Sequence, residues 1–405
     1  MNIAIAATAG MPQARTAAHQ SPLTRLFALM MLMFLAACSS VVPKGGQIPD
    51  KGPPPVESTD PNNVVLGDND RHRVALLLPL TGPDAEVGQS IANATTLAML
   101  DTRNATIRMT SYDTALGVDA AVRKAVADGN KLILGPLRSD DVIAVATIAG
   151  PAKVPVISFS NDIGAAGRNV FLMGHLPNQS IDRVVKYAFA MGQTRFGGIV
   201  SKDVYGQRAS SNITNSVRAA GGTVVSIQEI DGSAASIEAA TKKLAVAGVM
   251  DAVLIADSGR VAITTVPALR RNGVKTAKIL GTDRWNVDSS LTASIPMRGA
   301  WFAAVPDATY RQYAEKYRVR FAKSPMRISS LGYDSVLLIA RVAQSWKIGT
   351  AFPVTRLTDP EGFIGIDGAF RFFANGQSER MLEVLEVQAG KYATVDAAPK
   401  NFAGK

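Results

Sequence analysis

The chain has 405 residues, of which 47% are apolar and 19% are charged, so most of it can bury a hydrophobic core and wholesale disorder is excluded. Lys and Arg exceed Asp and Glu by ten, but the basic residues are scattered and aromatic residues make up only 6%. This distribution predicts an ordinary basic surface and no nucleic-acid partner, with attraction to an anionic component of the cell envelope as the alternative. The single cysteine, Cys38, excludes an internal disulfide and a cysteine-based zinc site.

The first 37 residues have the features of an export signal. They contain Arg15, Arg25 and no acidic residue, and residues 26–37 form an unbroken apolar run of twelve. A run of that length suits a signal peptide and is shorter than the roughly 18–20 residues that a membrane-spanning helix needs. The run ends in Leu-Ala-Ala-Cys at residues 35–38, which resembles the bacterial lipobox. The resemblance implies that the Cys38 sulfur carries lipid; a buried free cysteine is the alternative.

Residues 38–70 are expected to be a linker behind this anchor. Six prolines and four glycines fall between residues 39 and 70, and Pro-rich segments of this kind stay extended and build no core. The Asp-Asn-Asp triplet at residues 68–70 lacks the Gly and the distal Glu of a calcium loop, so we expect no metal there. Ser39, directly after the cysteine, implies delivery to the outer membrane by similarity to bacterial lipoproteins.

From residue 71 onward, short apolar runs alternate with helical patterns in two successive series. The first series predicts strands at 74–80, 107–112, 132–134 and 156–158, with helices at 85–101, 118–128 and 140–149. The second predicts helices at 180–191, 207–220, 236–247 and 261–272, with strands at 196–200, 223–228, 252–255 and 278–280. Parallel strands need helical crossovers, so the two series predict two doubly wound α/β lobes. Near the end, Asn375-Gly376 predicts a hairpin between residues 370–373 and 381–387.

Four loops that follow predicted strands are candidates for ligand contacts, because ligands of open α/β sheets collect at the carboxyl ends of the strands. Each loop also has a purely structural interpretation. The hydroxyl of Ser139 could face an anionic group or cap a helix. Tyr205 could lie over a ligand or pack, and Asp283 could bind a ligand or make a turn beside a packing tryptophan. The loop at residues 158–162 could bind a ligand or simply turn, and its candidate residues are Ser158, Ser160 and Asn161.

Patterns typical of catalysis are absent from the sequence. The three histidines, at positions 19, 72 and 175, stand apart from one another. There is no His-Glu-x-x-His, Gly-x-Ser-x-Gly, P-loop or Gly-x-Gly-x-x-Gly motif. We therefore expect a protein that is not an enzyme and that needs no cofactor or metal, with hydrolysis of a cell-wall substrate as a third hypothesis.

Four stretches, at residues 74–82, 134–139, 154–158 and 203–206, follow one another in the chain at a characteristic spacing. Through them the chain between Arg73 and about Val395 resembles the type I periplasmic binding proteins, specifically the leucine-binding family. The resemblance implies a periplasmic-binding-protein type I fold with two Rossmann-like lobes joined by three crossovers, near 174–177, 303–306 and 349–358. The implied domains are an N-terminal lobe of residues 71–176 plus 306–350 and a C-terminal lobe of residues 177–305 plus 351–396.

The resemblance also implies roles for individual residues. Ser139 matches the serine that binds an amino acid's carboxylate, and Tyr205 matches the tyrosine that stacks on the ligand. Asp283 falls where an acid meets the α-ammonium group, and Tyr333 matches a tyrosine of the cleft. Asp162 departs from the family, which usually places a small hydroxyl residue there, and a carboxylate opposite a carboxylate is unfavourable. This departure favours a cationic or muropeptide-like ligand, or none, over a simple amino acid.

Within that family, further segments are similar to the penicillin-binding protein activators, the LpoA-like lipoproteins. These segments are residues 88–90, 281–285, 357–363 and 365–372. The similarity implies a lipid-anchored protein on the periplasmic face of the envelope, in the outer membrane, that stimulates a peptidoglycan synthase. The alternative is a receptor that delivers a small polar or amino-acid-like ligand to an ABC transporter.

Overall fold

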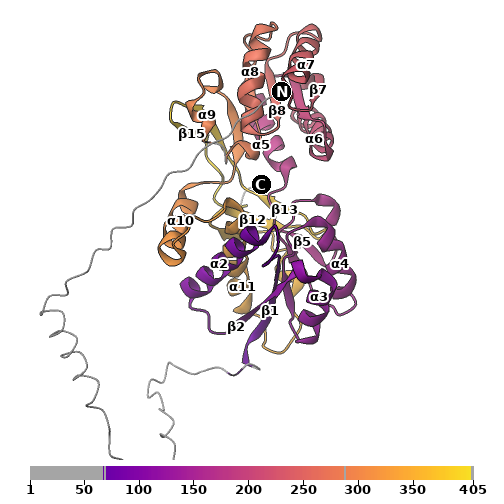
Figure 1. Ribbon diagram of the computed structural model, residues 1–405, viewed down its shortest axis with the longest axis vertical. Coiled ribbons are helices and arrows are strands. Elements are labelled where there is room, and N and C mark those ends of the chain that lie inside the picture. The colour runs from indigo at the N-terminus through magenta and orange to yellow at the C-terminus, as the bar shows by residue number, and fades with distance from the viewer. Residues whose placement is uncertain (1–66, 68–69, 287–288, 403–405) are drawn as a thin grey trace, which may run out of the picture. The chain divides into compact units, whose positions relative to one another are not determined.

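The computed structural model describes residues 67, 70–286 and 289–402. The predicted signal peptide, Cys38 and almost all of the predicted linker lie outside the described residues. Most of the described residues belong to two lobes, each built on its own β-sheet with helices on both faces (Figure 1). The predicted α/β architecture of two lobes is therefore confirmed, and every strand and helix of the two predicted series is present. No helix of the described part of the chain is long and apolar enough to cross a membrane.

The first lobe contains a five-stranded parallel sheet in the order β2-β1-β3-β4-β5. Along β1, alternate residues enter two different cores: Val74 and Leu76 pack on one face, and Ala75 and Leu77 on the other. Because both faces are covered, the strand needs a continuous apolar run, which is the pattern seen in the sequence. The strands are β1 (His72–Leu78), β2 (Ile107–Asp113), β3 (Leu132–Leu134), β4 (Val156–Ser158) and β5 (Val170–Leu172).

Helices cover the two faces of this sheet in pairs. One core contains α2 (Ala85–Thr102) and α11 (Ser330–Ala343), and the other contains α3 (Val118–Ala127) and α4 (Ser139–Ala149). Helix α10 (Ala308–Phe321) packs outside α2, with its tyrosines in a further cluster. Strand β5 and helix α10 were not anticipated from the sequence.

The second lobe contains a seven-stranded sheet in the order β15-β14-β10-β9-β8-β6-β7. Its strands from β6 to β10 run parallel, and β14 and β15 add to one edge in antiparallel fashion. Helices α5 and α6 cover one face, and α7 and α8 cover the other. The strands are β6 (Arg195–Ser201), β7 (Thr223–Ile230), β8 (Ala252–Ala256), β9 (Lys278–Gly281), β10 (Trp301–Ala304), β14 (Glu383–Gln388) and β15 (Lys391–Asp396), and the helices are α5 (Pro177–Ala190), α6 (Val204–Ala220), α7 (Ala234–Val246), α8 (Gly259–Arg271) and the short α9 (Ser290–Ala293).

The third crossing between the lobes lies later in the chain than the sequence predicted. Residues 352–372 contribute large apolar side chains to the first lobe's core, so assigning the whole of 351–396 to the second lobe was wrong. A small antiparallel sheet forms there from β11 (Phe363–Gly365), β12 (Gly368–Phe372) and β13 (Ser378–Arg380). The chain crosses only at residues 381–382, where Leu382 enters the second lobe's core. A burial pattern indicates that a segment needs a core but does not say which core.

The Asn-Gly turn does form a hairpin, though a shorter one than predicted. Strands β12 and β13 pair on either side of it, and Gly376 adopts a φ of +84°, which suits glycine. Residues 383–388 do not continue that hairpin and instead form β14 of the second sheet. The chain also passes between the lobes at residues 173–176, between β5 and α5, and at residues 305–307, between β10 and α10.

Candidate functional site

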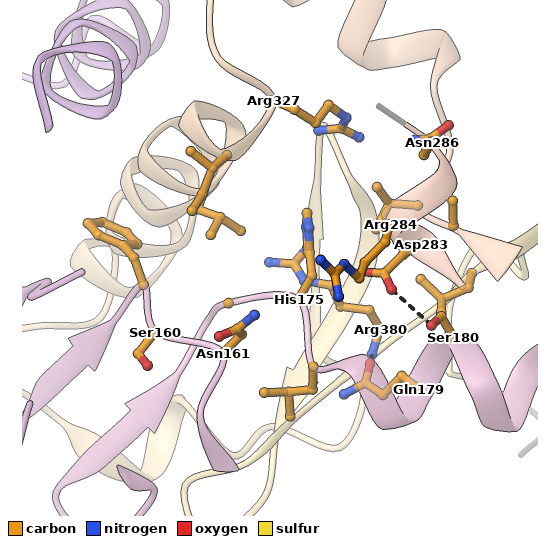
Figure 2. A pocket seen from close by; sticks show the side chains of 18 of the residues that line it. Ser160, Asn161, His175, Gln179, Ser180, Asp283, Arg284, Asn286, Arg327 and Arg380 are labelled. Atoms are coloured by element: carbon orange, nitrogen blue, oxygen red, sulfur yellow. Dashed lines mark hydrogen bonds between the residues drawn. The ribbon is translucent and has the colours of Figure 1, made fainter. Parts of the chain in front are cut away.

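A cavity of about 450 Å³ lies at the level where the chain crosses between the lobes (Figure 2). The loop after β4 supplies Ser160 and Asn161, and the first crossing supplies His175. The second lobe supplies Ser180 from α5 and Asp283 from the 3-10 helix η4 (Asp283–Trp285). The remaining wall is largely apolar and includes Phe159, Leu176, Val305, Ile328, Leu331 and Leu382.

A second, more polar cavity of about 860 Å³ adjoins the first. The two cavities share the lining residues Asn161, Asp283 and Arg284. The first turns of α6 line the outer cavity with Tyr205 and Arg208, and other amide and hydroxyl side chains complete its wall. The site therefore has an inner part with apolar walls and an outer part rich in hydrogen-bonding groups.

Two glycines allow the backbone to bring these loops together. A Cβ at Gly174 would lie 2.3 Å from the carbonyl oxygen of Ser160, so only glycine lets the first crossing pack beside the loop after β4. A Cβ at Gly281 would lie 2.3 Å from the Trp285 ring. The buried Trp285 indole donates a hydrogen bond to the carbonyl of Asp257 at 3.1 Å and so holds η4, which carries Asp283 and Arg284.

A buried network of charges forms the floor of the inner cavity. Both oxygens of Asp367 are engaged: Arg327 donates to one at 2.7 Å, and Ser330 donates to the other at 2.6 Å. His175 Nε2 also lies 3.0 Å from Asp367 Oδ2. Burial acts to raise the pKa of Asp367, but the charge of Arg327 and the contact with His175 outweigh it and hold that pKa far below its usual range. Asp367 is therefore ionised.

A second acid of this network, Asp334, has the opposite electrostatic balance. Burial, together with the charge of Asp367, raises the pKa of Asp334 to about 7. Its oxygens accept hydrogen bonds from the backbone N–H groups of Ile366 and Asp367, at 2.6 and 3.4 Å. A nitrogen of the Arg380 guanidinium lies 3.7 Å away, and that guanidinium also packs 4.7 Å from the centre of the Phe370 ring. The positive charge of Arg380 acts on both acids and lowers the pKa of each.

Asp283 lines both cavities, and Tyr205, which lines the outer one, contacts the same loop. Asp283 accepts a hydrogen bond from Ser180 at 2.9 Å, drawn as a dashed line in Figure 2, and burial raises its pKa. The Arg284 guanidinium lies 4.5 Å from the centre of the Tyr205 ring. The Tyr205 hydroxyl lies 3.2 Å from Thr282 Oγ1, and burial raises the pKa of Tyr205 to about 12. Tyr205 is therefore neutral and can only hydrogen-bond or stack.

Four of the seven predicted ligand residues line these cavities, and three do not. Ser160, Asn161 and Asp283 line the inner cavity, and Tyr205 lines the outer one. Ser158 is buried; its hydroxyl donates to the carbonyl of Pro136 at 2.8 Å and accepts from the N–H of Ser160 at 3.0 Å. It thereby shapes the loop without reaching the cavity. The ligand roles of the four lining residues stay predictions.

Ser139 and Tyr333 are not brought to either cavity. Ser139 is the first residue of α4, Arg138 occupies the N-cap position, and no side chain caps this helix end. The Tyr333 hydroxyl donates to Asp101 on α2 at 2.7 Å, inside an aromatic cluster. The reason is helical phase: Leu331 of α11 faces the inner cavity, and a residue two positions later lies on nearly the opposite side of the helix.

Asp162 does not oppose a bound anion in the way the sequence suggested. It lines neither cavity. One of its oxygens accepts from the N–H of Gly164 at 2.9 Å and lies 2.8 Å from Arg208 of the second lobe. Because this charge is paired, it gives no reason to exclude a carboxylate ligand.

The basic residues of the inner cavity were not predicted from the sequence as ligand residues. They are His175, Arg284, Arg327 and Arg380. Their partners are distant in the chain: His175 and Asp367, for example, are 192 positions apart. No local pattern could have indicated that pairing. Within residues 70–286 and 289–402, no group of three or more His, Cys, Asp or Glu residues could hold a metal ion.

Comparisons with known proteins agree with this architecture. A family model described as a periplasmic binding protein matches residues 72–391. Among curated proteins, an uncharacterised protein, RP748, of Rickettsia prowazekii is 23% identical over 340 residues, covering 80% of this chain and 88% of that protein. The penicillin-binding protein activator LpoA of Photobacterium profundum is 28% identical over 142 residues, covering 33% of this chain but only 23% of that protein.

Solved structures extend the same likeness in the fold. A putative branched-chain amino acid ABC transporter protein of Rhodospirillum rubrum superimposes with a TM-score of 0.72 at 18% identity, covering 80% of this chain and all of that one. Full-length LpoA of Haemophilus influenzae gives a TM-score of 0.65 at 19% identity, covering 81% of this chain and 59% of that one.

Proposed function

The chain belongs to the family of periplasmic binding proteins, and from that membership we propose that it is a non-enzymatic protein of the cell envelope that holds a small anionic ligand between its lobes. The inner cavity carries this proposal. The volume of this cavity, about 450 Å³, falls within the range of roughly 300–1,000 Å³ that small-molecule sites occupy. Arg284, Arg327 and Arg380 line it beside apolar walls, so a carboxylate attached to an apolar group matches both kinds of surface.

A free α-amino acid fits this lining less well. Ser139 and Tyr333, the serine and one of the two tyrosines that the family resemblance assigned to such a ligand, line neither cavity. Of the acidic groups near the cavity, Asp283 lines it, and burial raises its pKa and so weakens its hold on an ammonium group. The charges that face the cavity are mainly positive, which favours a simple anion over a zwitterion.

The contacts of the cavity's reactive side chains support binding over catalysis. His175 is engaged with Asp367, and Ser180 donates to Asp283. Among the described residues these contacts do not join a hydroxyl to an imidazole, which is the pairing that activates a serine nucleophile. The His175 and Ser180 side chains are thus engaged in contacts with carboxylates of the protein itself.

The test is a thermal-shift and calorimetry screen with benzoate as the apolar carboxylate and leucine as the zwitterion. We expect benzoate to raise the melting temperature and leucine to have little effect. Arg284→Gln should weaken benzoate binding about 10- to 100-fold, the loss of one hydrogen bond to a charged group. Arg318→Gln, on the exposed face of α10, is the matched control. If no small carboxylate binds, or if leucine binds and benzoate does not, the proposal fails.

A second function, activation of a penicillin-binding protein, is supported by the similarity to two LpoA proteins. This chain spans less than two thirds of the length of either LpoA protein. Activation of a penicillin-binding protein by this chain is therefore a proposal. The test is a pull-down from its own envelope followed by an assay of the captured synthase. Faster glycan polymerisation or cross-linking with the purified chain present is expected, and an unchanged rate with a directly binding synthase would contradict this role.

The proposed location is the periplasmic side of the envelope, with the chain anchored through lipid on Cys38. The lipobox-like sequence before that residue supports the anchor. Lipid anchoring predicts that the protein fractionates with outer membranes and that Cys38→Ser releases it into the soluble fraction. Membrane attachment that survives this substitution would contradict the anchor without affecting the ligand proposal.

A further inference from the structure

The C-terminal segment returns from the second lobe to the first after the three crossings already described. Strand β15 ends at Asp396, opposite Val384 in the second sheet. Six residues later Phe402 is only 5% exposed and packs against Ala369 and Met381. Ala369 is part of β12 in the first lobe, and the N–H of Met381 donates to its carbonyl.

The end of this segment in the second lobe is held by an ion pair as well as by the strand. Asp396 Oδ2 lies 2.7 Å from a terminal nitrogen of Arg183 on α5. The Nε–H of the same arginine donates to the carbonyl of Leu382 at 2.9 Å. Arg183 therefore joins the start of the returning segment to the third crossing.

The other end is held by a shaped receptacle on the first lobe. The Arg371 guanidinium lies 4.4 Å from the centre of the Phe402 ring, and Glu379 accepts hydrogen bonds from that guanidinium at 2.9 and 2.7 Å. Gly362 has a φ of +68°, and a Cβ there would lie 2.9 Å from Phe402 Cε2. The receptacle thus consists of an oriented cation and a position open only to glycine, which is more than incidental apolar contact.

Between these two ends the chain is short and restricted. Residues 397 and 399–401 are exposed, so they add little packing of their own. Pro399 fixes its own φ and limits Ala398 to extended conformations. Six residue steps can span at most about 20 Å. A movement of the lobes that takes the two ends more than about 20 Å apart must therefore pull Phe402 out of its receptacle.

We propose that residues 397–402 form a strap that restrains the movement of one lobe relative to the other. The strap acts on the hinge itself, so it does not depend on the identity of a ligand. The strap is a fourth connection between the lobes, in addition to the three crossings, and its end at Phe402 is held by non-covalent contacts. Its strength is set by Phe402 and Arg371 on one lobe and by Asp396 and Arg183 on the other.

The test measures the spread of lobe–lobe distances by pulsed EPR in the full chain without ligand. In a Cys38→Ser background, spin labels at Ile143→Cys and Val204→Cys report from α4 and α6, where both side chains are exposed. The decisive variant inserts Gly-Gly-Ser between Ala397 and Ala398, which gives the strap slack and leaves both ends intact. We expect the distance distribution to broaden. The same insertion after Gly273, an exposed turn within the second lobe, is the control and should leave the distribution unchanged.

Phe402→Ala separates a strap from local packing. If the segment is a strap, Phe402→Ala and the insertion should broaden the distribution equally, and the combined variant should broaden it no further. An insertion variant that melts normally and keeps the original distribution would overturn the proposal, as would additive broadening in the combined variant. Because no ligand is used, failure of benzoate to bind would leave this result untouched.

Discussion

Replacing Arg380 with methionine should strongly destabilise the first lobe. The Arg380 side chain is 1% exposed, and its positive charge attracts two buried acids, Asp334 and Asp367. Methionine fills much of the volume but removes the positive charge that attracts both acids. Breaking a buried ion pair by removing one partner costs about 3–5 kcal/mol, because the remaining charge is left unpaired away from water. We expect a loss of that size in the free energy of unfolding.

The pH dependence of this loss follows from the two pKa shifts. Burial and the charge of Asp367 raise the pKa of Asp334 to about 7 in the native protein, above its value in the unfolded chain. The native state therefore holds a proton that the unfolded state releases, so this group's stabilising contribution is present at low pH and is lost as the pH rises toward 7. At pH 5 Asp334 is already neutral and Asp367 keeps its ion pair with Arg327, so the variant loses mainly the attraction between the charges of Arg380 and Asp367. At pH 8 the variant must either ionise Asp334 beside Asp367 without the charge of Arg380 or keep Asp334 protonated against the solution pH, so the loss should be larger.

Calorimetric melting at pH 5 and pH 8 measures the effect. Arg318→Met is the matched control, because Arg318 pairs with Glu315 on the exposed surface of α10. Exposed pairs contribute about 0–1 kcal/mol, so this control should melt nearly as the native protein does. The reasoning is refuted if Arg380→Met destabilises no more than the control, or if its loss is greater at pH 5 than at pH 8.

Two further predictions follow from single positions. Gly206→Ala should destabilise the second lobe severely, because the added Cβ would lie 1.6 Å from the carbonyl oxygen of Ser201; Gly167→Ala, with no atom within 4 Å, should melt nearly as the native protein does. Burial raises the pKa of Asp283, so its negative charge appears at higher pH than usual, and benzoate affinity should fall as the pH rises through that pKa. Calorimetric titration of Asp283→Asn should show a flatter profile, and an unchanged profile would mean that another group is responsible.

Local sequence periodicity determined most of the two lobes. The run Val-Ala-Leu-Leu-Leu at residues 74–78 predicts a strand covered on both faces, and β1 is such a strand. Helix and strand bounds in the two series follow from residues a few positions apart, because a period of 3.6 or 2 is a property of neighbours in the chain. The same local patterns pointed to the loops after β4, β6 and β9, where Asn161, Tyr205 and Asp283 line the cavities.

What the sequence could not provide was the choice among distant partners. The side chains of Phe363 and Phe370 indicated burial, but only the folded chain decided that they join the core of the first lobe. The pairing of His175 with Asp367 likewise depends on where two segments 192 positions apart come to rest. Hydrophobic burial is non-directional, so an apolar pattern predicts that a segment will be covered and leaves open by what. The basic character of the cavity therefore depends on tertiary structure, whereas the strands and helices that frame it follow from the spacing of neighbouring residues in the sequence.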